Sequence, residues 1–377
     1  MGIVVTGMGS VSAAGGDLAT QWVNLHHGGK NWTFDPTTGL AIYPVSGLHD
    51  RPALDTFCRS RSVDRSSLLA LHAAEQAVEQ AGWGEREFAI LVGCSRGPTH
   101  AWEESYTEFA ATGRTQARSS PLTTLGSIGF ALADYLGTSS LASSLSVTCS
   151  SGMHALLHGV ALLRAGMADR VLVGGTEASL TPFTLRQMQA LRVYATPAAE
   201  TTYACRPLDL PATGMVIGEG AAFLALERVD TGREGLQLEV GFAREQARSA
   251  TGITVQGLGL QQAMRRALGS HRSVDAVVAH APGTARGDAA ERAAVRQVFA
   301  QNGAVPQLIS FKWATGHTFG ASGPLALVTA IEMLRRESLL GLPYGARHHD
   351  RRGGRVLVNA TGFGGNAVSV LVAASGG

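Results

Sequence analysis

Short apolar segments alternate with longer amphipathic segments along most of the chain. Short runs rich in β-branched residues predict strands over residues 3–6, 89–92, 170–173, 222–226, 237–240, 275–279, 307–310, 355–358 and 368–372. Apolar positions that recur every three or four residues predict helices over residues 65–81, 122–136, 150–165, 257–268, 288–299 and 321–336. This alternation is typical of layered α/β proteins with mostly buried sheets.

Two polar stretches interrupt the pattern. The segment at 230–235 is the best candidate for a boundary, which divides the chain into an N-terminal half, 1–232, and a C-terminal half, 233–377. Residues 95–120 are polar and weakly periodic, and we expect an excursion or lid there. No repeat is visible in the sequence, although duplicated halves can diverge beyond recognition.

Composition excludes several classes of protein. Hydrophobic residues make up 45% of the chain and charged residues 16%, which excludes a disordered protein. A net charge of +2, from 31 basic and 29 acidic residues, gives no basis for binding nucleic acid or a membrane surface. No apolar run approaches the ~20 residues that cross a bilayer. The four cysteines form no CxxC pair, so we expect a cytoplasmic protein without disulfides or a cysteine-rich metal site.

One cysteine occupies a position suited to a nucleophile. Cys149 follows an apolar run and precedes the small residues 150–152, which open a predicted helix. The positive end of a helix favours the thiolate, and its unpaired backbone N–H groups can face a developing oxyanion. A lone cysteine is more often structural, and we expect Cys58, Cys94 and Cys205 to be inert. The small neighbours of Cys149 favour the nucleophile.

Two histidines occupy strand-to-helix loops in the second half. His280 ends a predicted strand, and Asp288 can cap the next helix with Glu291 in capping-box spacing. His317 lies five residues after Lys312, which is one of only two lysines in the chain. A lysine retained among so many arginines indicates a need for a compact ammonium group. Taken alone, a histidine such as His280 is as often structural as functional.

The order of these segments resembles that of the elongating, two-histidine β-ketoacyl–acyl carrier protein synthases, which have the thiolase fold. TCSS, AHAPGTARGDAAE, KWATGH and GFGG carry the resemblance, together with the opening IVVTGMGSVSAAG and the segment CRPLDLPATGMVIGEGAAFLALE. It implies a five-layer α-β-α-β-α sandwich of two similar halves. It also implies decarboxylative condensation of a malonyl thioester with an acyl group held on the enzyme.

The family's motif implies a role for each matching residue. Cys149 corresponds to the acyl-accepting nucleophile, and His280 and His317 correspond to the histidines that bind the malonyl thioester carbonyl. Lys312 and Glu291 resemble an ion pair that orients these histidines. The physical logic is consistent, because two neutral imidazole N–H groups can stabilise an enolate oxygen without a metal.

Further roles follow from the same resemblance. The backbone N–H groups of Cys149 and Phe363 would form an oxyanion hole, and Phe363 matches the family's gating phenylalanine. Thr284 matches a threonine that contacts the pantetheine arm, and Gly364 lies in the glycine turn beside the substrate. The resemblance implies no cofactor or metal, because substrates arrive on the phosphopantetheine of an acyl carrier protein.

Arginines suggest where a carrier would dock. Arg59, Arg61 and Arg65 lie where the family binds its acidic carrier protein, although an arginine-biased sequence also produces a merely solvated basic surface. The resemblance further implies a homodimer, with a heterodimer that contains a second ketosynthase-like subunit as the alternative.

The chain also departs from the family's pattern. Residues 281–282 are Ala-Pro where Gly-Thr is common, Thr361 replaces an aromatic residue, and residues 366–367 are Asn-Ala rather than Thr-Asn. These changes affect substrate choice and gating more than the class of reaction. They favour a synthase of secondary metabolism, of the type II polyketide or polyene kind.

Other functions remain as alternatives. A chain-length factor keeps the fold and pairs with an active synthase but replaces the nucleophile, whereas Cys149, His280 and His317 are all present here. Priming synthases have an asparagine in place of the second histidine, and thiolases have a second cysteine near the C-terminus. A Cys–His acyl hydrolase would have no obvious use for the motif that joins Lys312 to His317. Acyl length, starter unit and cognate carrier are not encoded in these motifs.

Overall fold

The computed structural model describes residues 2–84, 86–229, 236–246, 253–300, 305–345 and 354–374. The strands of its large sheet are β1 (Gly2–Ser12), β4 (Ala89–Gly93), β5 (Ala142–Leu145), β6 (Arg170–Glu177), β8 (Gly220–Val229), β9 (Leu236–Arg244), β10 (Ala276–Val278), β11 (Gln307–Ile309), β12 (Arg355–Gly362) and β13 (Asn366–Ala374). These 10 strands follow the order β11-β10-β12-β13-β9-β1-β8-β6-β4-β5. A three-stranded sheet contains β2 (Thr33–Phe34), β3 (Ala41–Tyr43) and β7 (Ile217–Gly218). All nine predicted strands are confirmed.

The large sheet consists of two halves with the same pairing pattern. In the first, β4 pairs parallel to β5 and β6, β6 pairs antiparallel to β8, and β8 pairs antiparallel to β1. In the second, β10 pairs parallel to β11 and β12, β12 antiparallel to β13, and β13 antiparallel to β9. One residue pair, Val4 and Gln237, joins the halves through β1 and β9. The two halves therefore share a topology that the sequence does not reveal.

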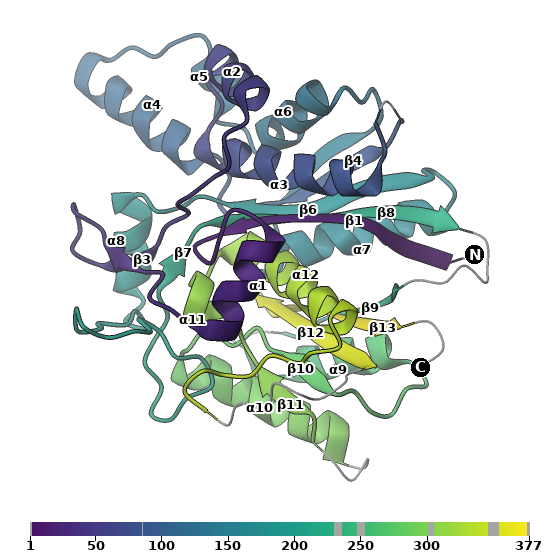
Figure 1. Cartoon of the computed structure of the whole chain (residues 1–377). Coiled ribbons are helices and arrows are strands. Elements are labelled where there is room, and N and C mark those ends of the chain that lie inside the picture. The colour runs from purple at the N-terminus through teal and green to yellow at the C-terminus, as the bar shows by residue number, and fades with distance from the viewer. Residues whose placement is uncertain are drawn as a thin grey trace.

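Helices form three layers around the two half-sheets (Figure 1). The first half-sheet is covered on its outer face by α3 (Arg65–Ala81) and α6 (Gly126–Leu136). The central layer contains α7 (Ser151–Arg164) and α12 (Ser322–Arg335), and the second outer layer contains α9 (Leu258–Leu268) and α10 (Ala285–Phe299). This arrangement confirms the predicted α-β-α-β-α sandwich. The predicted boundary segment, 230–235, lies outside the described residues.

Burial and capping explain why the predicted helices form. In α12, every residue from Ser322 to Leu334 is buried, because sheets or helices pack against all sides of this central helix. In α3, the Asp64 side chain caps the first turn by accepting from the N–H of Ser66 at 2.7 Å. The left-handed Gly82 then ends the helix at the predicted residue.

Two predicted helix starts are wrong. Helix α6 begins at Gly126 rather than at 122, because a separate short helix covers Ser119–Leu122. Helix α10 begins at Ala285 rather than at 288, because Thr284 is its N-cap and its Oγ1 accepts from the N–H of Gly287 at 3.3 Å. Asp288 therefore does not cap the helix. Its carboxylate instead accepts from the backbone N–H groups of Leu208, at 2.7 Å, and Gly283, at 3.0 Å. These bonds fasten the loop that follows His280.

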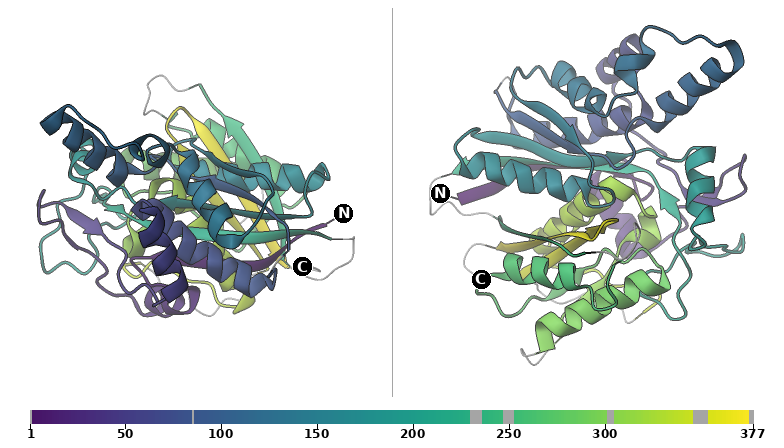
Figure 2. Two further views of the ribbon diagram at one scale, coloured as in Figure 1. Left: turned by 90° about the horizontal axis from the view of Figure 1, so that it is seen from above. Right: turned by 180° about the vertical axis from the view of Figure 1, so that it is seen from behind.

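Several short helices were not predicted. They are α1 (Leu18–His27), α2 (Pro52–Arg61), α4 (Thr99–Thr112), α5 (Ser119–Leu122), α8 (Pro182–Ala190), α11 (Lys312–Thr315) and the 3₁₀ helix η2 (Phe319–Ala321). Helix α4 occupies the polar stretch 95–120, buries none of its residues, and projects from the body of the molecule (Figures 1 and 2). None of the described helices combines the length and the apolar character needed to cross a membrane.

Candidate active site

Cys149 lies in a tight turn between β5 and α7. Thr148, directly before it, has a φ of +51°, which is uncommon for a residue with a side chain. Two glycines let the η2 segment approach this turn closely. A Cβ at Gly152 would lie 2.6 Å from the carbonyl oxygen of Gly320, and a Cβ at Gly175 would lie 2.5 Å from the same oxygen. The start of α7 therefore packs directly against the loop that carries His317.

A buried Cys–His pair results from this contact. The Nε2 of His317 lies 3.3 Å from the Sγ of Cys149, and both side chains are buried. On the other side of the ring, Nδ1 lies 3.3 Å from the hydroxyl oxygen of Ser322, which accepts from the backbone N–H of Thr318 at 3.0 Å. The Ser322 hydroxyl can accept from Nδ1 or donate to it, so this contact is compatible both with a free Nε2 that can take a proton and with an Nε2 that carries one. Sequence analysis did not identify Ser322.

His280 completes a cluster of three potential catalytic side chains. It follows β10, and its ring centroid lies 5.3 Å from that of His317, with the planes nearly perpendicular. The Nδ1 of His280 is buried and has no hydrogen-bond partner among the described residues. Cys149, His280 and His317, which come from three distant segments, are thus brought together.

Lys312 and Glu291 hold the backbone of His280 from two sides. The Nζ of Lys312 donates to the carbonyl oxygen of His280. The Glu291 carboxylate accepts from the N–H groups of His280, at 2.9 Å, and Ala281, at 2.7 Å. It also accepts from the side-chain amide of Asn359 at 3.0 Å. The expected direct ion pair is wrong, because no N–O distance of 4.0 Å or less joins Lys312 and Glu291, both of which are described.

Burial sets the charge of the cluster. It raises the pKa of the Cys149 thiol to about 12, and the neighbouring Glu177 carboxylate acts in the same direction. Burial therefore acts against the thiolate that the start of α7 is predicted to favour. Burial, with the nearby Lys312 ammonium, also holds the pKa values of His280 and His317 well below the usual range.

The supporting charges are shifted in the same way. Burial lowers the pKa of Lys312 to about 8, although Glu291 and Cys149 oppose the shift. Burial raises the pKa of the Glu291 carboxyl, while its hydrogen bonds to backbone N–H groups and to Asn359 act against the shift. For both groups burial thus acts against the charged form, while hydrogen bonds and opposite charges act in favour of it.

Sequence analysis missed one buried acid beside the cluster. Glu177, at the end of β6, accepts from the backbone N–H groups of Ser95 (2.9 Å), Arg96 (3.2 Å) and Gly320 (3.1 Å). It also accepts from the hydroxyl of Ser179 at 2.8 Å. These bonds tie the first half to the η2 segment that follows His317. The available signal was a lone acidic residue at the end of an apolar strand, which no motif distinguishes.

The predicted glycine turn lies beside the cysteine turn. Phe363 and Gly364 belong to the tight connection between β12 and β13, which are antiparallel. The carbonyl oxygen of Phe363 accepts from the hydroxyl of Thr148 at 3.5 Å. The Phe363 side chain is partly exposed, and the backbone N–H groups of Cys149 and Phe363 lie outside the adjoining helix and strands. This geometry is compatible with the expected oxyanion hole, which stays a prediction.

The remaining predicted residues are placed as follows. Thr284 lies in the loop after His280, where its hydroxyl oxygen caps α10 and leaves its proton free to donate to a ligand.

Arg59 and Arg61 are exposed near the end of α2, and Arg61 lies 3.5 Å from Asp134. Arg65 differs, because its guanidinium forms two contacts with the buried Glu219 carboxylate, Nε to Oε2 at 2.7 Å and Nη2 to Oε1. The docking role expected for Arg65 is therefore replaced by a structural ion pair.

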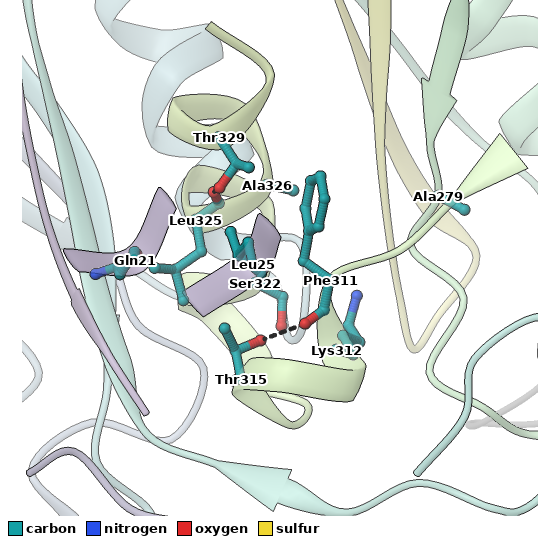
Figure 3. Close-up of a pocket in the computed structure, with 10 residues that line it drawn as sticks. All are labelled: Gln21, Leu25, Ala279, Phe311, Lys312, Thr315, Ser322, Leu325, Ala326 and Thr329. Carbon is teal, nitrogen blue, oxygen red and sulfur yellow. Dashed lines mark hydrogen bonds between the residues drawn. The ribbon is translucent and has the colours of Figure 1, made fainter. Parts of the chain in front are cut away.

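A small cavity lies behind Lys312 (Figure 3). Its volume is about 20 Å³, and it is lined by residues of α1, α11 and α12 together with Ala279 and Phe311. Figure 3 shows Thr315 bonded to the carbonyl oxygen of Phe311 at its edge. The space suits one water molecule and is too small for an acyl chain. Among the described residues, no group of three or more His, Cys, Asp or Glu side chains could hold a metal ion.

Comparison with known proteins agrees with this geometry. A putative polyketide β-ketoacyl synthase 1 of Streptomyces cyaneus is 27% identical, covering 100% of this chain and 98% of the relative. A type II polyketide ketosynthase in complex with its acyl-carrier protein has a TM-score of 0.85 at 22% identity, covering 99% of both chains. A ketosynthase in complex with its chain length factor, from Xenorhabdus doucetiae, has a TM-score of 0.81 at 22% identity, covering 99% of this chain and 98% of that one.

Family assignments cover most of the sequence. Residues 1–231 match the β-ketoacyl synthase N-terminal domain, and residues 238–342 match the β-ketoacyl synthase C-terminal domain. Cys149 lies in the first match, and His280 and His317 lie in the second. The chain therefore belongs to the β-ketoacyl synthase family and has its thiolase-like fold.

Proposed function

We propose that this chain condenses an acyl group held on Cys149 with a malonyl thioester, with loss of CO₂. The observation that carries the proposal is the buried cluster of Cys149, His280 and His317. The Nε2 of His317 lies 3.3 Å from the Cys149 sulfur, and the ring centroids of His280 and His317 are 5.3 Å apart. Members of the family are condensing acyltransferases. Their substrates are carried on phosphopantetheine, so the reaction requires no metal or further cofactor.

Acyl transfer to Cys149 is the first step. His317 lies where its Nε2 can take the thiol proton as the sulfur attacks the thioester carbonyl. The new C–S bond forms, the bond to the pantetheine sulfur breaks, and the released thiol takes the proton back from His317. The backbone N–H groups of Cys149 and Phe363 are the proposed donors to the oxyanion that develops in this step.

Condensation is the second step. Malonyl thioester binds with its carbonyl oxygen facing the Nε2–H groups of His280 and His317, and cleavage of its carboxylate as CO₂ leaves an enolate on that oxygen. The enolate carbon attacks the acyl carbonyl, so that a C–C bond forms and the C–S bond to Cys149 breaks. The released thiolate takes up one proton from solvent, which restores the thiol. In this step the Ser322 hydroxyl donates to Nδ1 and the proton of His317 is on Nε2, whereas during acyl transfer Nδ1 carries the proton and Nε2 is free.

Lys312 and Glu291 act as positioning residues in this proposal. Neither touches the cysteine in the described geometry, but both bond to the backbone of His280. They fix the loop from which the imidazole projects. Because the pKa of Lys312 lies near 8, condensing activity should decline above this pH as its donor to His280 loses its charge.

The decisive experiment separates loading from decarboxylation. Intact mass spectrometry after mixing with acyl-carrier thioesters should show one acyl group on wild type and none on Cys149→Ala. Cys149→Ala should lose condensation and can retain malonyl decarboxylation, whereas His280→Ala and His317→Ala should lose decarboxylation. Full condensation by either histidine variant would contradict the mechanism. An adduct that hydrolyses rapidly, without a condensation product, would favour the Cys–His hydrolase.

An acyl carrier protein is the proposed delivering partner. Arg59 and Arg61 are both exposed in the last turn of α2 and can pair with the acidic surface of a carrier. The structural neighbour bound to its acyl-carrier protein supports the choice of partner class. The proposed contacts of the pantetheine arm are Thr284, in the loop after His280, and Gly364, in the turn between β12 and β13.

A second ketosynthase-like subunit is the other proposed partner. Trp102, Tyr106 and Phe109 repeat along one side of α4, and each is more than half exposed. Strand β5 is an edge strand of the large sheet, with the exposed Phe130 and Leu141 nearby in sequence. Such an apolar surface is typical of a subunit interface. Light scattering should show a dimer of this chain, and Tyr106→Glu should shift it toward monomer.

A role as a chain-length factor is the alternative. The structural neighbour solved with its chain length factor shows that such pairs exist in this fold. The presence of Cys149, His280 and His317 in contact range favours catalysis by this chain itself. Activity of the purified chain alone would support a homodimeric enzyme, whereas activity only with a second subunit would support the heterodimer.

A further inference from the structure

Arg96 carries a positive charge that has no role in the proposed reaction steps. It follows β4 in the loop before α4, and its guanidinium donates to the side-chain oxygen of Gln187 on α8. Its Cζ lies 5.9 Å from the ring centroid of Phe319, and that ring lies 5.1 Å from the ring of His317. Arg96 and His317 thus both lie beside the ring of Phe319.

The aromatic ring beside Arg96 lies in an apolar cluster. Phe319 belongs to the buried cluster that contains Cys149, together with Leu185 and Met188 from α8. These side chains are therefore the neighbours that an acyl group on the Cys149 sulfur would first meet. The Arg96 cation also lowers the pKa of the thiol against the larger effect of burial, which places its charge within electrostatic range of the sulfur.

The Arg96 guanidinium is incompletely paired. Its Nε is buried without a hydrogen-bond partner, and no carboxylate oxygen lies within 4.0 Å among the described residues. The one carboxylate nearby, that of Glu177, instead accepts from the backbone N–H of Arg96. A neutral amide and an aromatic ring compensate a cation only weakly, so the guanidinium keeps a donor, Nε, that a further oxygen acceptor could use.

Resting on the proposed function, we infer that Arg96 selects acyl groups that carry an oxygen acceptor, a ketone or a carboxylate, along the chain. A guanidinium donates through a planar set of N–H groups that suits such oxygens, and its donors would be left unpaired by an alkyl chain. The selection acts on the acyl group loaded on Cys149, not on the malonyl unit. Saturated acyl chains of equal size should therefore load more slowly.

The test compares loading of isosteric acyl groups. Carrier-bound 5-methylhexanoyl, 5-oxohexanoyl and glutaryl groups are similar in size and differ in the oxygen at carbon five, and a second series places it at carbon six. Rates of acylation of Cys149 are followed by intact mass spectrometry. Wild type should load at least one oxygenated group about tenfold faster than its alkyl isostere, as expected for a site that hydrogen-bonds its substrate. Comparison of the 5-oxohexanoyl and glutaryl groups shows whether the site prefers a ketone or a carboxylate.

Three variants make the test specific. Arg96→Ile should load the alkyl and oxygenated groups within about twofold of each other, because no hydrogen-bonding discrimination remains. Gln187→Glu keeps the arginine but supplies a carboxylate at the position of the present amide oxygen, so it should reduce glutaryl loading most. Arg114→Ile, at an exposed loop position outside the site, should keep the wild-type preference.

The outcomes separate this inference from the proposed function. Equal loading of all isosteres by wild type, or an unchanged preference in both Arg96→Ile and Gln187→Glu, would overturn the inference and leave the condensing function intact. A change confined to the KM for malonyl thioester would also overturn it, because Arg96 would then bind the extender. Failure of wild type to form any Cys149 adduct would instead contradict the proposed function.

Discussion

At the scale of the residue, the Cys149–His317 pair is neutral at rest. Burial raises the pKa of the thiol to about 12 and lowers that of the imidazole, so a thiol faces a neutral ring at pH 7. The thiolate must form only as the proton moves across 3.3 Å to Nε2. This arrangement protects the cysteine from unwanted reactions in the absence of substrate.

The reactivity of Cys149 toward iodoacetamide should therefore depend steeply on pH. With a pKa of about 12, the thiolate fraction rises about tenfold per pH unit from pH 7 to pH 10, without reaching a plateau. The measurement is the initial alkylation rate of the Cys149 peptide by mass spectrometry, with N-acetylcysteine as a reference that levels off near its ordinary pKa. A plateau for Cys149 below pH 9 would show that the thiol is already activated in the resting protein.

The principal catalytic candidates and two of their supports, Lys312 and Glu291, were predictable, whereas the other buried polar groups around them were not. Cys149, His280 and His317 lie in motifs whose small and glycine-rich neighbours are visible in the sequence. Glu177 and Arg96 act through contacts with segments more than 80 residues away in the chain, such as Gln187 and Gly320. No local pattern encodes such contacts, because they depend on how two half-sheets are stacked.

At the scale of the element, the turn between β12 and β13 positions Phe363. Two adjacent glycines in this turn have different surroundings. Gly364 and Gly365 have φ values of +82° and +80°, a conformation that favours glycine. A Cβ at Gly365 would lie 2.3 Å from the carbonyl oxygen of Glu245, whereas a Cβ at Gly364 would meet only the Asn366 amide at 3.5 Å. The backbone of Glu245 in turn donates to Gly365.

Gly365→Ala should consequently be more damaging than Gly364→Ala. Both carry the left-handed backbone penalty of about 1 kcal/mol, and Gly365→Ala adds a backbone clash of about 1–3 kcal/mol. Because the clash displaces the turn, kcat for condensation should fall more in Gly365→Ala than in its neighbour. Urea denaturation and condensation kinetics measure the two effects. Equal losses in both variants would mean that backbone strain alone, and not the contact with Glu245, governs the turn.

Prediction of elements succeeded where burial was regular. Helix α3 packs one face against the first half-sheet, and α12 is buried on all sides, so both helices carry enough apolar residues to be visible in the sequence. Helix α4 does not, since it buries none of its residues and so leaves no apolar stripe facing a core. Helix α10 starts three residues early because Thr284, rather than the acidic Asp288, supplies the cap.

At the scale of the whole molecule, the duplicated topology places Cys149 and His317 in equivalent positions. Cys149 follows β5 and precedes α7, and His317 follows β11 and precedes α12. In each half this strand is the outermost one of the parallel set, and its helix enters the central layer. The catalytic pair therefore forms where the two central helices begin. The sequence conceals this relation, because equivalent positions carry different residues.

Two arginines that look alike in the sequence should behave differently when changed. Arg65 is two-thirds buried and pairs with Glu219, whose side chain is 2% exposed, so Arg65→Met leaves a buried carboxylate without its partner. This should lower the free energy of unfolding by about 3–5 kcal/mol, whereas Arg65→Met combined with Glu219→Leu should recover much of the loss. Urea denaturation measures both.

Arg61→Glu should leave stability almost unchanged, because its side chain is 61% exposed and its pair with Asp134 is a surface ion pair. If Arg61 docks the carrier, reversal of its charge should raise KM for carrier-bound substrate and weaken the dependence of KM on salt, since fewer attractive charges remain to be screened. The KM for the same acyl group on free pantetheine should not change, because that substrate lacks the acidic protein. A parallel rise in both KM values would place the effect of Arg61 inside the site rather than on the docking surface.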